Sequence, residues 1–215
     1  MNTATATKRL TVVTHPLVQH KLSYLRDRAT PTVHFRKLVN ELTLLLTYEA
    51  TKDFSTEPYE IETPLERMEA QRISGKKVAV CPVLRAGVGM LDGVLSLVSS
   101  ARVGFIGMYR DEETLEPVQY YVKLPVDLSD RDAIVLDPML ATGHSSSAAI
   151  AAVKETGAQS VTFVCLVAAP PGIEHLHGQH PDVHIVTAAV DRGLNERGFI
   201  VPGLGDAGDR LYGTK

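Results

Sequence analysis

Short apolar segments alternate with helical segments over the C-terminal two thirds of the chain, and this alternation is the strongest constraint on the fold. The apolar segments predict strands at 78–84, 102–108, 133–137, 161–168 and 183–190. Helical patterns lie between them at 88–100, 145–156 and, more weakly, 171–178. Because such alternation is typical of right-handed βαβ units, we predict an α/β fold with a mainly parallel twisted sheet flanked by helices.

The rest of the chain adds two helices and one irregular segment to this sheet. Amphipathic patterns predict a short helix at 17–28 and a long one at 32–53. Residues 111–125, DEETLEPVQYYVKLP, interrupt the alternation with charges and two prolines. We expect this segment to protrude as a hood, either a lid over a site or a β-arm. With 215 residues and no internal repeat, the chain is predicted to form one domain, 1–215.

Composition argues against several classes of partner. The net charge is −3, with 22 basic and 25 acidic residues, so the sequence shows no basic field for nucleic acid. No stretch approaches the roughly 18 apolar residues of a membrane span, and MNTATATKRL lacks the apolar core of a secretory signal. Cys81 and Cys165 lie in apolar runs and are expected to be buried, reduced thiols. These features predict a cytoplasmic protein.

Polar side chains follow three of the predicted strands, where parallel sheets bind their ligands. Arg85 and Arg110 follow two of them, and Asp137 with the turn up to Ser145 follows the third. Arginine forks, and the free N–H groups of a turn at a helix N-terminus, bind phosphate well. Each feature alone has an ordinary explanation, such as a solvated charge or a helix cap. Their coincidence on successive strand ends predicts a site for a multiply phosphorylated ligand.

Two glycine motifs are poor candidates for a nucleotide site. GVGMLDG at 87–93 follows a strand, but its third glycine comes one residue late for a dinucleotide fingerprint. GLGDAG at 203–208 fits the letters of that fingerprint, but the seven residues after it are too few for the required helix and strand. The sequence also lacks the GxxxxGK[ST] pattern of a P-loop.

The segment IVLDPMLATGHS, 134–145, resembles the phosphoribosyl pyrophosphate motif of type I phosphoribosyltransferases, and most closely that of the uracil phosphoribosyltransferase family. The resemblance extends along the chain. It covers the segments 15–22, 45–51, 82–95, 107–117, 137–143 and 194–215. It implies the type I phosphoribosyltransferase fold and the transfer of phosphoribose to uracil, giving UMP and pyrophosphate.

The resemblance also implies roles for individual residues. Arg85, Arg110 and Asp137 would be catalytic, and the Leu84–Arg85 peptide tends to be cis in this family. Asp137 would hold the ribose hydroxyls, and the turn at 141–145 would hold the 5′-phosphate. The full implied donor site comprises Arg85, Arg110, Asp137, Pro138, Met139, Leu140, Ala141, Thr142, Gly143, His144, Ser145 and Asp206.

Uracil would bind to the tail 194–215, at Ile200, Gly205, Asp206 and Ala207, largely through backbone groups. Two positions depart from the pattern of many phosphoribosyltransferases: Pro138 replaces a second acid, as in the uracil enzymes, and His144 replaces a glycine. A cluster of four further histidines, His175, His177, His180 and His184, lacks an acidic or thiolate partner at ligand spacing and is expected on a solvated surface.

The implied cofactor is Mg²⁺, bound mainly by the substrate rather than by the protein. The implied partners are phosphoribosyl pyrophosphate, uracil and further copies of the chain in a dimer or tetramer, and GTP remains open as an allosteric activator. Two alternatives remain. One is a regulator that senses these ligands and binds RNA, which the balanced charge disfavours. The other is a phosphoribosyltransferase with a different base.

Overall fold

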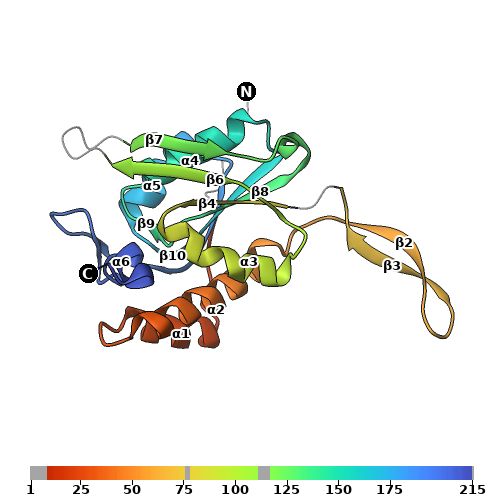
Figure 1. The fold of residues 1–215 in the computed structure, drawn as a ribbon, viewed down its shortest axis with the longest axis horizontal. Coiled ribbons are helices and arrows are strands. Elements are labelled where there is room, and N and C mark those ends of the chain that lie inside the picture. Colours follow the sequence, from red (N-terminus) through yellow and green to blue (C-terminus); the bar gives the residue numbers. More distant parts are fainter. Residues whose placement is uncertain (1–8, 76–77, 111–116, 215) are drawn as a thin grey trace, which may run out of the picture.

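The computed structural model describes residues 9–75, 78–110 and 117–214 and shows the predicted α/β architecture (Figure 1). Within these residues the main sheet has nine strands. Seven of them follow the order β1-β11-β10-β8-β4-β6-β7, and the short strands β5 and β9 pair with β4 and β10. Their bounds are β1 Leu10–Val12, β4 Ala79–Leu84, β5 Arg102–Val103, β6 Phe105–Arg110, β7 Pro117–Lys123, β8 Asp132–Leu136, β9 Met139–Leu140, β10 Ser160–Ala168 and β11 His184–Val190.

The helices also follow the prediction. The two N-terminal helices are α1 (Pro16–Arg26) and α2 (Thr32–Ala50), and the crossover helices are α3 (Leu91–Leu97), α4 (His144–Glu155) and α5 (Pro170–Gln179). A sixth helix, α6 (Ala207–Tyr212), lies in the tail, and 3₁₀-helices occur at Ala86–Met90 (η1) and Leu128–Asp130 (η2).

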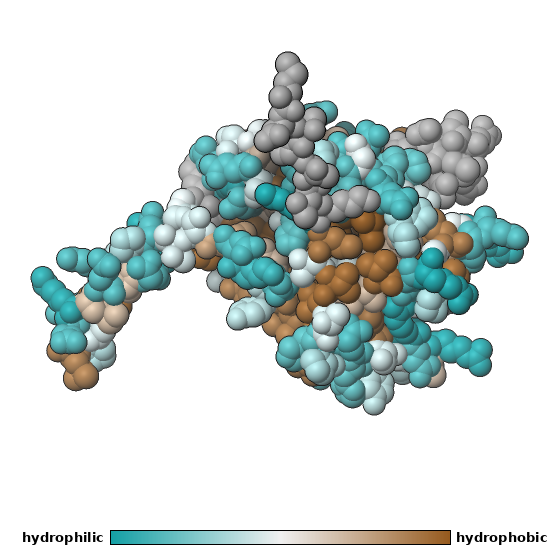
Figure 2. Space-filling model, turned by 180° about the vertical axis from the view of Figure 1, so that it is seen from behind, coloured by the Kyte–Doolittle hydropathy of each residue, from teal (hydrophilic) through white to brown (hydrophobic). Residues whose placement is uncertain are grey.

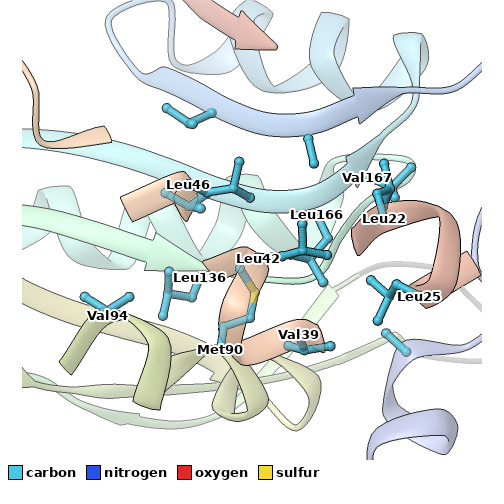
Figure 3. Packing of buried hydrophobic residues seen from close by; sticks show 14 of the residues in the cluster. Leu22, Leu25, Val39, Leu42, Leu46, Met90, Val94, Leu136, Leu166 and Val167 are labelled. Carbon is cyan, nitrogen blue, oxygen red and sulfur yellow. The ribbon is translucent and has the colours of Figure 1, made fainter. Parts of the chain in front are cut away.

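Helices cover both faces of the sheet, and the strands divide their side chains between them. Val80 of β4 belongs to the cluster formed with α1 and α2, whereas its neighbours Ala79 and Cys81 belong to the cluster formed with α4 and α5. Figure 3 shows the first cluster, where Leu42 of α2 lies close to Leu166 of the sheet. This two-sided burial explains why the strands are continuously apolar.

The predicted strand 102–108 is divided into β5 and β6, and the segment 111–125 contains the antiparallel edge strand. Within that segment, Pro117–Lys123 forms β7 and pairs with β6, while 111–116 lies outside the described residues. The main sheet is otherwise parallel. A role of this segment as a lid remains a prediction.

The sequence did not predict the antiparallel arm formed by β2 (Thr56–Glu62) and β3 (Arg67–Ile73). It projects from the body of the molecule in Figure 1. Most of its residues are exposed, and Leu65 at its tip is 95% exposed. In Figure 2 the arm is largely hydrophilic, whereas apolar residues gather in a patch on the main body. The arm lacks the apolar alternation that signals a half-buried strand, which explains why the pattern did not reveal it.

Candidate active site

The three predicted strand ends lie side by side at one edge of the sheet. Strand β4 pairs in parallel with β8 on one side and with β6 on the other. Leu84, the last residue of β4, is in register with Gly107 of β6, and Pro82 is in register with Leu136, the last residue of β8. The residues that follow these strands therefore converge, because the carboxyl ends of parallel strands face the same edge.

The Arg85 turn is compact and is built against the end of β8. The Leu84–Arg85 peptide is cis, which confirms the expectation from the family resemblance. Arg85 is exposed and precedes η1. A Cβ on Gly87 would lie 2.4 Å from the carbonyl oxygen of Leu136, so only glycine allows η1 to approach β8 this closely. The turn therefore holds the Arg85 backbone beside Asp137, which follows Leu136.

Arg110 is the last residue of β6, on the far side of β4 from Asp137. Its backbone position agrees with a place at the same edge of the sheet. Its side chain, like residues 111–116, lies outside the part of the chain that the structure describes.

Asp137 is partly buried between β8 and β9. Its Oδ1 accepts a long hydrogen bond from the N–H of Met139, at 3.4 Å. Burial raises the pKa of the Asp137 carboxyl to about 7, against an ordinary value of 3.8, and the Met139 N–H lowers it by a smaller amount. A hydroxyl or a cation bound to this carboxylate would stabilise its charged form, because the contact would offset the loss of solvation.

The turn after β9 leads directly into α4. Gly143, with a φ of +86°, is the N-cap residue, and no side chain of the described residues caps the helix. The carbonyl of Gly143 accepts the first helical bond, from Ser147, at 2.8 Å. The N–H groups at 144–146 precede that bond and therefore lack partners within the helix. Together with the positive end of the helix dipole, they suit an anion.

The helix begins at His144 rather than at 145, and the turn rests on α5. A Cβ on Gly143 would lie 2.7 Å from the carbonyl oxygen of Gly172. His144 is exposed, and its ring packs against that of His175, with centroids 4.2 Å apart. Burial, and to a lesser extent the neighbouring His144, lowers the pKa of His175.

The expectation of a solvated histidine surface was wrong. His177 is only 7% exposed, since it lies on the inner side of α5. His180 is 3.0 Å from the Ser147 hydroxyl, and His184 is 2.8 Å from the Thr11 hydroxyl. The sequence pattern predicts only a weak helix in this segment, and it therefore did not reveal which side chains turn inward.

The tail places its predicted base-binding residues at the same edge of the molecule. Ile200 lies in β13 (Ile200–Val201), which pairs with β12 (Gly193–Leu194) and is followed by a cis Val201–Pro202 peptide. Gly205 has a φ of +80°, and Asp206 caps α6 by accepting a hydrogen bond from Asp209 N–H at 2.9 Å. Ile200 and Ala207 are buried, whereas Gly205 and Asp206 are exposed.

The tail and the Arg85 turn are in direct contact. The hydroxyl of Tyr212 donates to the carbonyl of Arg85 at 2.8 Å. A Cβ on Gly89, in η1, would lie 2.8 Å from the side chain of Leu211. The structure therefore brings the predicted base-binding tail against the turn that carries Arg85. Tyr212 had not been singled out from the sequence.

Sequence reasoning also missed Arg26 and Asp191. Asp191 follows β11, so it occupies a strand end like the three that were recognised. Its buried carboxylate contacts Arg26 at 2.6 Å and accepts from the N–H of Gly203 at 2.7 Å. The signal for Asp191 was present in the sequence, but Arg26 lies 165 residues away and nothing local indicates the pair.

The described residues lack the features of a metal-ion cluster and of a membrane-spanning helix. They contain no group of three or more His, Cys, Asp or Glu side chains that could hold a metal ion. None of the helices in this part of the chain is long and apolar enough to cross a membrane. The two cysteines are buried and unpaired, as expected, and burial raises the pKa of both thiols to about 12.

A mainly parallel sheet with a small-residue turn between its central strand and a helix, beside an arginine turn, defines the class of type I phosphoribosyltransferases. The family model for uracil phosphoribosyltransferase matches residues 12–214. The chain belongs to the uracil phosphoribosyltransferase family, and is therefore a glycosyltransferase.

Individual relatives agree with this assignment. The chain is 58% identical over 204 residues to a uracil phosphoribosyltransferase of Streptococcus mutans, covering 95% of this chain and 98% of the relative. It is 57% identical, with the same coverage, to one from a Geobacillus species. It also resembles a solved structure of an Aquifex aeolicus protein, with a TM-score of 0.92, 38% identity and coverage of 96% of this chain and 99% of the other.

Proposed function

We propose that this site transfers the phosphoribosyl group from phosphoribosyl pyrophosphate to uracil, giving UMP and pyrophosphate in pyrimidine salvage. The observation that carries the proposal is the convergence of Arg85, Asp137 and the turn at 141–145 on adjoining strand ends. The contact between Tyr212 and Arg85 supports it further, because the tail that the resemblance assigns to the base touches the turn that carries Arg85.

The geometry suggests which part of the chain would bind each part of phosphoribosyl pyrophosphate. The N–H groups at the start of α4 would bind the 5′-phosphate, and Asp137 would accept hydrogen bonds from the ribose hydroxyls. Arg85 and Arg110 would bind the pyrophosphate, which gains negative charge as its bond to C1 breaks. As that bond breaks, a uracil ring nitrogen forms the new bond to C1, and its proton passes to the departing pyrophosphate or to solvent water. The protein acts mainly by positioning the two reactants.

The donor set fits a Mg²⁺ ion that is bound mainly by the substrate. The described residues offer no cluster of metal ligands, and the Asp137 carboxylate after the end of β8 accepts a long backbone hydrogen bond from Met139. Asp137 would therefore hold the hydroxyls or water molecules that bind the ion. When bound, Mg²⁺ would supply positive charge to the leaving pyrophosphate.

Turnover against a panel of bases tests the proposal. With phosphoribosyl pyrophosphate and Mg²⁺, we expect UMP from uracil and far slower product formation from cytosine, hypoxanthine and guanine. Cytosine reverses the donor and acceptor at positions 3 and 4, so a backbone site built for uracil would leave polar groups unpaired, at about 1–3 kcal/mol each. Faster turnover of another base would identify a different phosphoribosyltransferase. Filter binding of a pyrimidine-operon leader RNA tests the alternative function as an RNA-binding regulator, because that function requires the protein to bind the RNA tightly.

Arg85→Ala is expected to lower kcat/KM for phosphoribosyl pyrophosphate about 10- to 100-fold, as the loss of a charged hydrogen-bonding group would. Arg85→Lys should recover only part of this, because an ammonium cannot reproduce the two-pronged contact of a guanidinium. Arg102→Ala is a matched control, since Arg102 is also exposed but begins β5 at the opposite edge of the sheet. Full activity in Arg85→Lys would show that the fork geometry is unimportant here.

The proposal extends to assembly, regulation and location. A homodimer or homotetramer is supported by the apolar patch on the main body (Figure 2), and light scattering during gel filtration tests it. Phosphoribosyl pyrophosphate and uracil are the small-molecule partners. Adding GTP to the assay of UMP formation tests whether GTP is an allosteric activator. A cytoplasmic location is supported by the two unpaired thiols, Cys81 and Cys165.

A further inference from the structure

A buried ion pair joins helix α1 to the residue that follows strand β11. The two guanidinium nitrogens of Arg26 donate to the two carboxylate oxygens of Asp191, at 2.8 and 2.6 Å. The side chain of Asp191 is only 5% exposed and that of Arg26 23%. This two-pronged contact between planar groups fixes the orientation of both side chains, and little of the pair is open to solvent.

Both members of the pair also hold the backbone of Gly203. Asp191 accepts from the N–H of Gly203 at 2.7 Å, and Arg26 donates to the carbonyl of the same residue at 2.7 Å. Gly203 has a φ of +64°, and a Cβ there would lie 2.1 Å from the carbonyl oxygen of Ile200. The chain therefore folds back on itself at Gly203, and side-chain bonds satisfy both of its backbone groups.

A second arginine holds the next residue. Arg210 of α6 donates to the carbonyl of Leu204 at 2.8 Å and to the carbonyl of Leu25, in α1, at 2.7 Å. Its guanidinium lies 4.3 Å from the ring centroid of Phe35 in α2. The carbonyls of Gly203 and Leu204 are thus bound by two arginines. Arg26 belongs to α1, and Arg210 also donates to the carbonyl of Leu25 in α1.

Asp191 is itself fixed to the main sheet. It follows β11, and its N–H donates to the carbonyl of Ala168, the last residue of β10, at 2.8 Å. The tail has little regular structure of its own, since β12 and β13 have two residues each. The position of the loop at 203–205 relative to the sheet therefore depends largely on the side chains of Arg26, Asp191 and Arg210.

We propose that Arg26 and Asp191 are positioning residues for the nucleobase, an inference that rests on the proposed function. They tie the carbonyl of Gly203 toward α1, and this sets the path on which Gly205 and Ala207 present their backbone groups to uracil. Neither side chain needs to touch the base. Because a backbone site selects its base by the placement of N–H and C=O groups, a small shift of the loop costs affinity for uracil. Most of the implied donor contacts lie elsewhere, in the Arg85 turn and the loop before α4, and Asp206 is the one implied donor residue in the tail.

Steady-state kinetics with each substrate varied separately test the proposal. Asp191→Asn removes the negative charge of the carboxylate and one of the two oxygens that accept from Arg26. Because a buried charged contact is broken, we expect KM for uracil to rise about tenfold or more. KM for phosphoribosyl pyrophosphate should change less than about twofold, as for a distant site. Arg26→Lys is the milder second variant. Lysine keeps the charge but cannot serve both carboxylate oxygens and the Gly203 carbonyl, so a smaller rise in KM for uracil is expected.

Glu41→Gln is the matched control. Lys21 of α1 pairs with Glu41 of α2 at 2.6 Å, and their side chains are 22% and 32% exposed. Glu41→Gln therefore breaks an ion pair of the same helix away from the loop, and the kinetic constants for both substrates should stay at wild-type values. Thermal unfolding of each variant shows how much stability each pair supplies.

The outcomes separate the inference from the proposed function. A selective rise in KM for uracil in both variants, with the control unchanged, supports the inference. Unchanged uracil KM, or an equal rise in KM for both substrates, would overturn it and leave the pair as a structural contact. Wild-type protein that fails to convert uracil would overturn the proposed function, and the inference with it.

Discussion

Replacing Asp137 with asparagine is expected to lower kcat/KM about 100-fold or more while leaving the fold intact. Asparagine keeps the size of the side chain, but it removes the negative charge at the end of β8, where the sugar gains positive charge as its bond to pyrophosphate breaks. Loss of one preorganised electrostatic contact in an enzyme site typically costs about 10²–10³ in rate. Steady-state rates of UMP formation measure the effect, and circular dichroism checks the fold.

The same substitution should make the protein more stable at neutral and alkaline pH. Burial raises the pKa of Asp137 in the folded chain to about 7 from 3.8, so ionisation of this carboxyl is less favourable in the folded chain than in the unfolded chain. The resulting cost to folding appears as the pH rises above 3.8 and is complete above about 7. We therefore expect Asp137→Asn to have a higher Tm than the wild type at pH 8, and the difference to vanish below pH 4.

Asp132→Asn is the control for both measurements. Asp132 begins the same strand at its opposite end and accepts a hydrogen bond from Ser160 at 2.5 Å. Its activity should stay close to that of the wild type. Normal kcat/KM in Asp137→Asn would remove Asp137 from the site, and a lower Tm at pH 8 would contradict the role of burial in its pKa.

Gly143→Ala is expected to raise KM for phosphoribosyl pyrophosphate about 100-fold and to destabilise the protein. The φ of +86° at this residue is rarely adopted by alanine. In addition, the new Cβ would lie 2.7 Å from the carbonyl oxygen and 3.2 Å from the Cα of Gly172, both of which belong to the backbone of α5. The turn or α5 must therefore move, and the N–H groups at the start of α4 would no longer converge on the phosphate.

Gly157→Ala separates the backbone strain from the steric clash. Gly157 follows the other end of α4 with a similar φ, +83°, but a Cβ there would meet only Ser129, at 3.5 Å or more. We expect this control to lose about 1 kcal/mol of stability, from backbone strain alone, and to keep its activity. Calorimetric titration with phosphoribosyl pyrophosphate compares the two variants. Equal donor affinity in both would show that the turn does not contact the phosphate.

The sheet and the strand ends of the candidate donor site were largely predictable from the sequence. The five predicted strands all lie in the main sheet, because two-sided burial leaves continuous apolar runs that can be recognised locally. Arg85 and Asp137 could be placed at one edge because consecutive βαβ units put strand ends on the same side. The position of the turn before α4 could also be predicted, to within one residue at its end, since small residues there come soon after a buried strand.

The remaining features depend on contacts that no local pattern records. The β2–β3 arm has few buried residues, so apolar periodicity did not reveal it. His177 turns inward although its segment shows only a weak helical pattern, because packing against the body decides which side of α5 is covered. Arg26 and Asp191 are far apart in the sequence and adjacent in the fold.

The sequence by itself determined the α/β class, the order of the five predicted strands with the helices between them, and the small-residue turn before α4, because apolar periodicity and turn chemistry are properties of neighbouring residues. Only the tertiary structure decided how the tail is held. Gly203 is bound by an ion pair between Arg26 and Asp191, and Arg210 bridges Leu204 and Leu25. Such pairings arise from the packing of α1, β11 and α6 in space, where partners more than 160 residues apart come within hydrogen-bond distance.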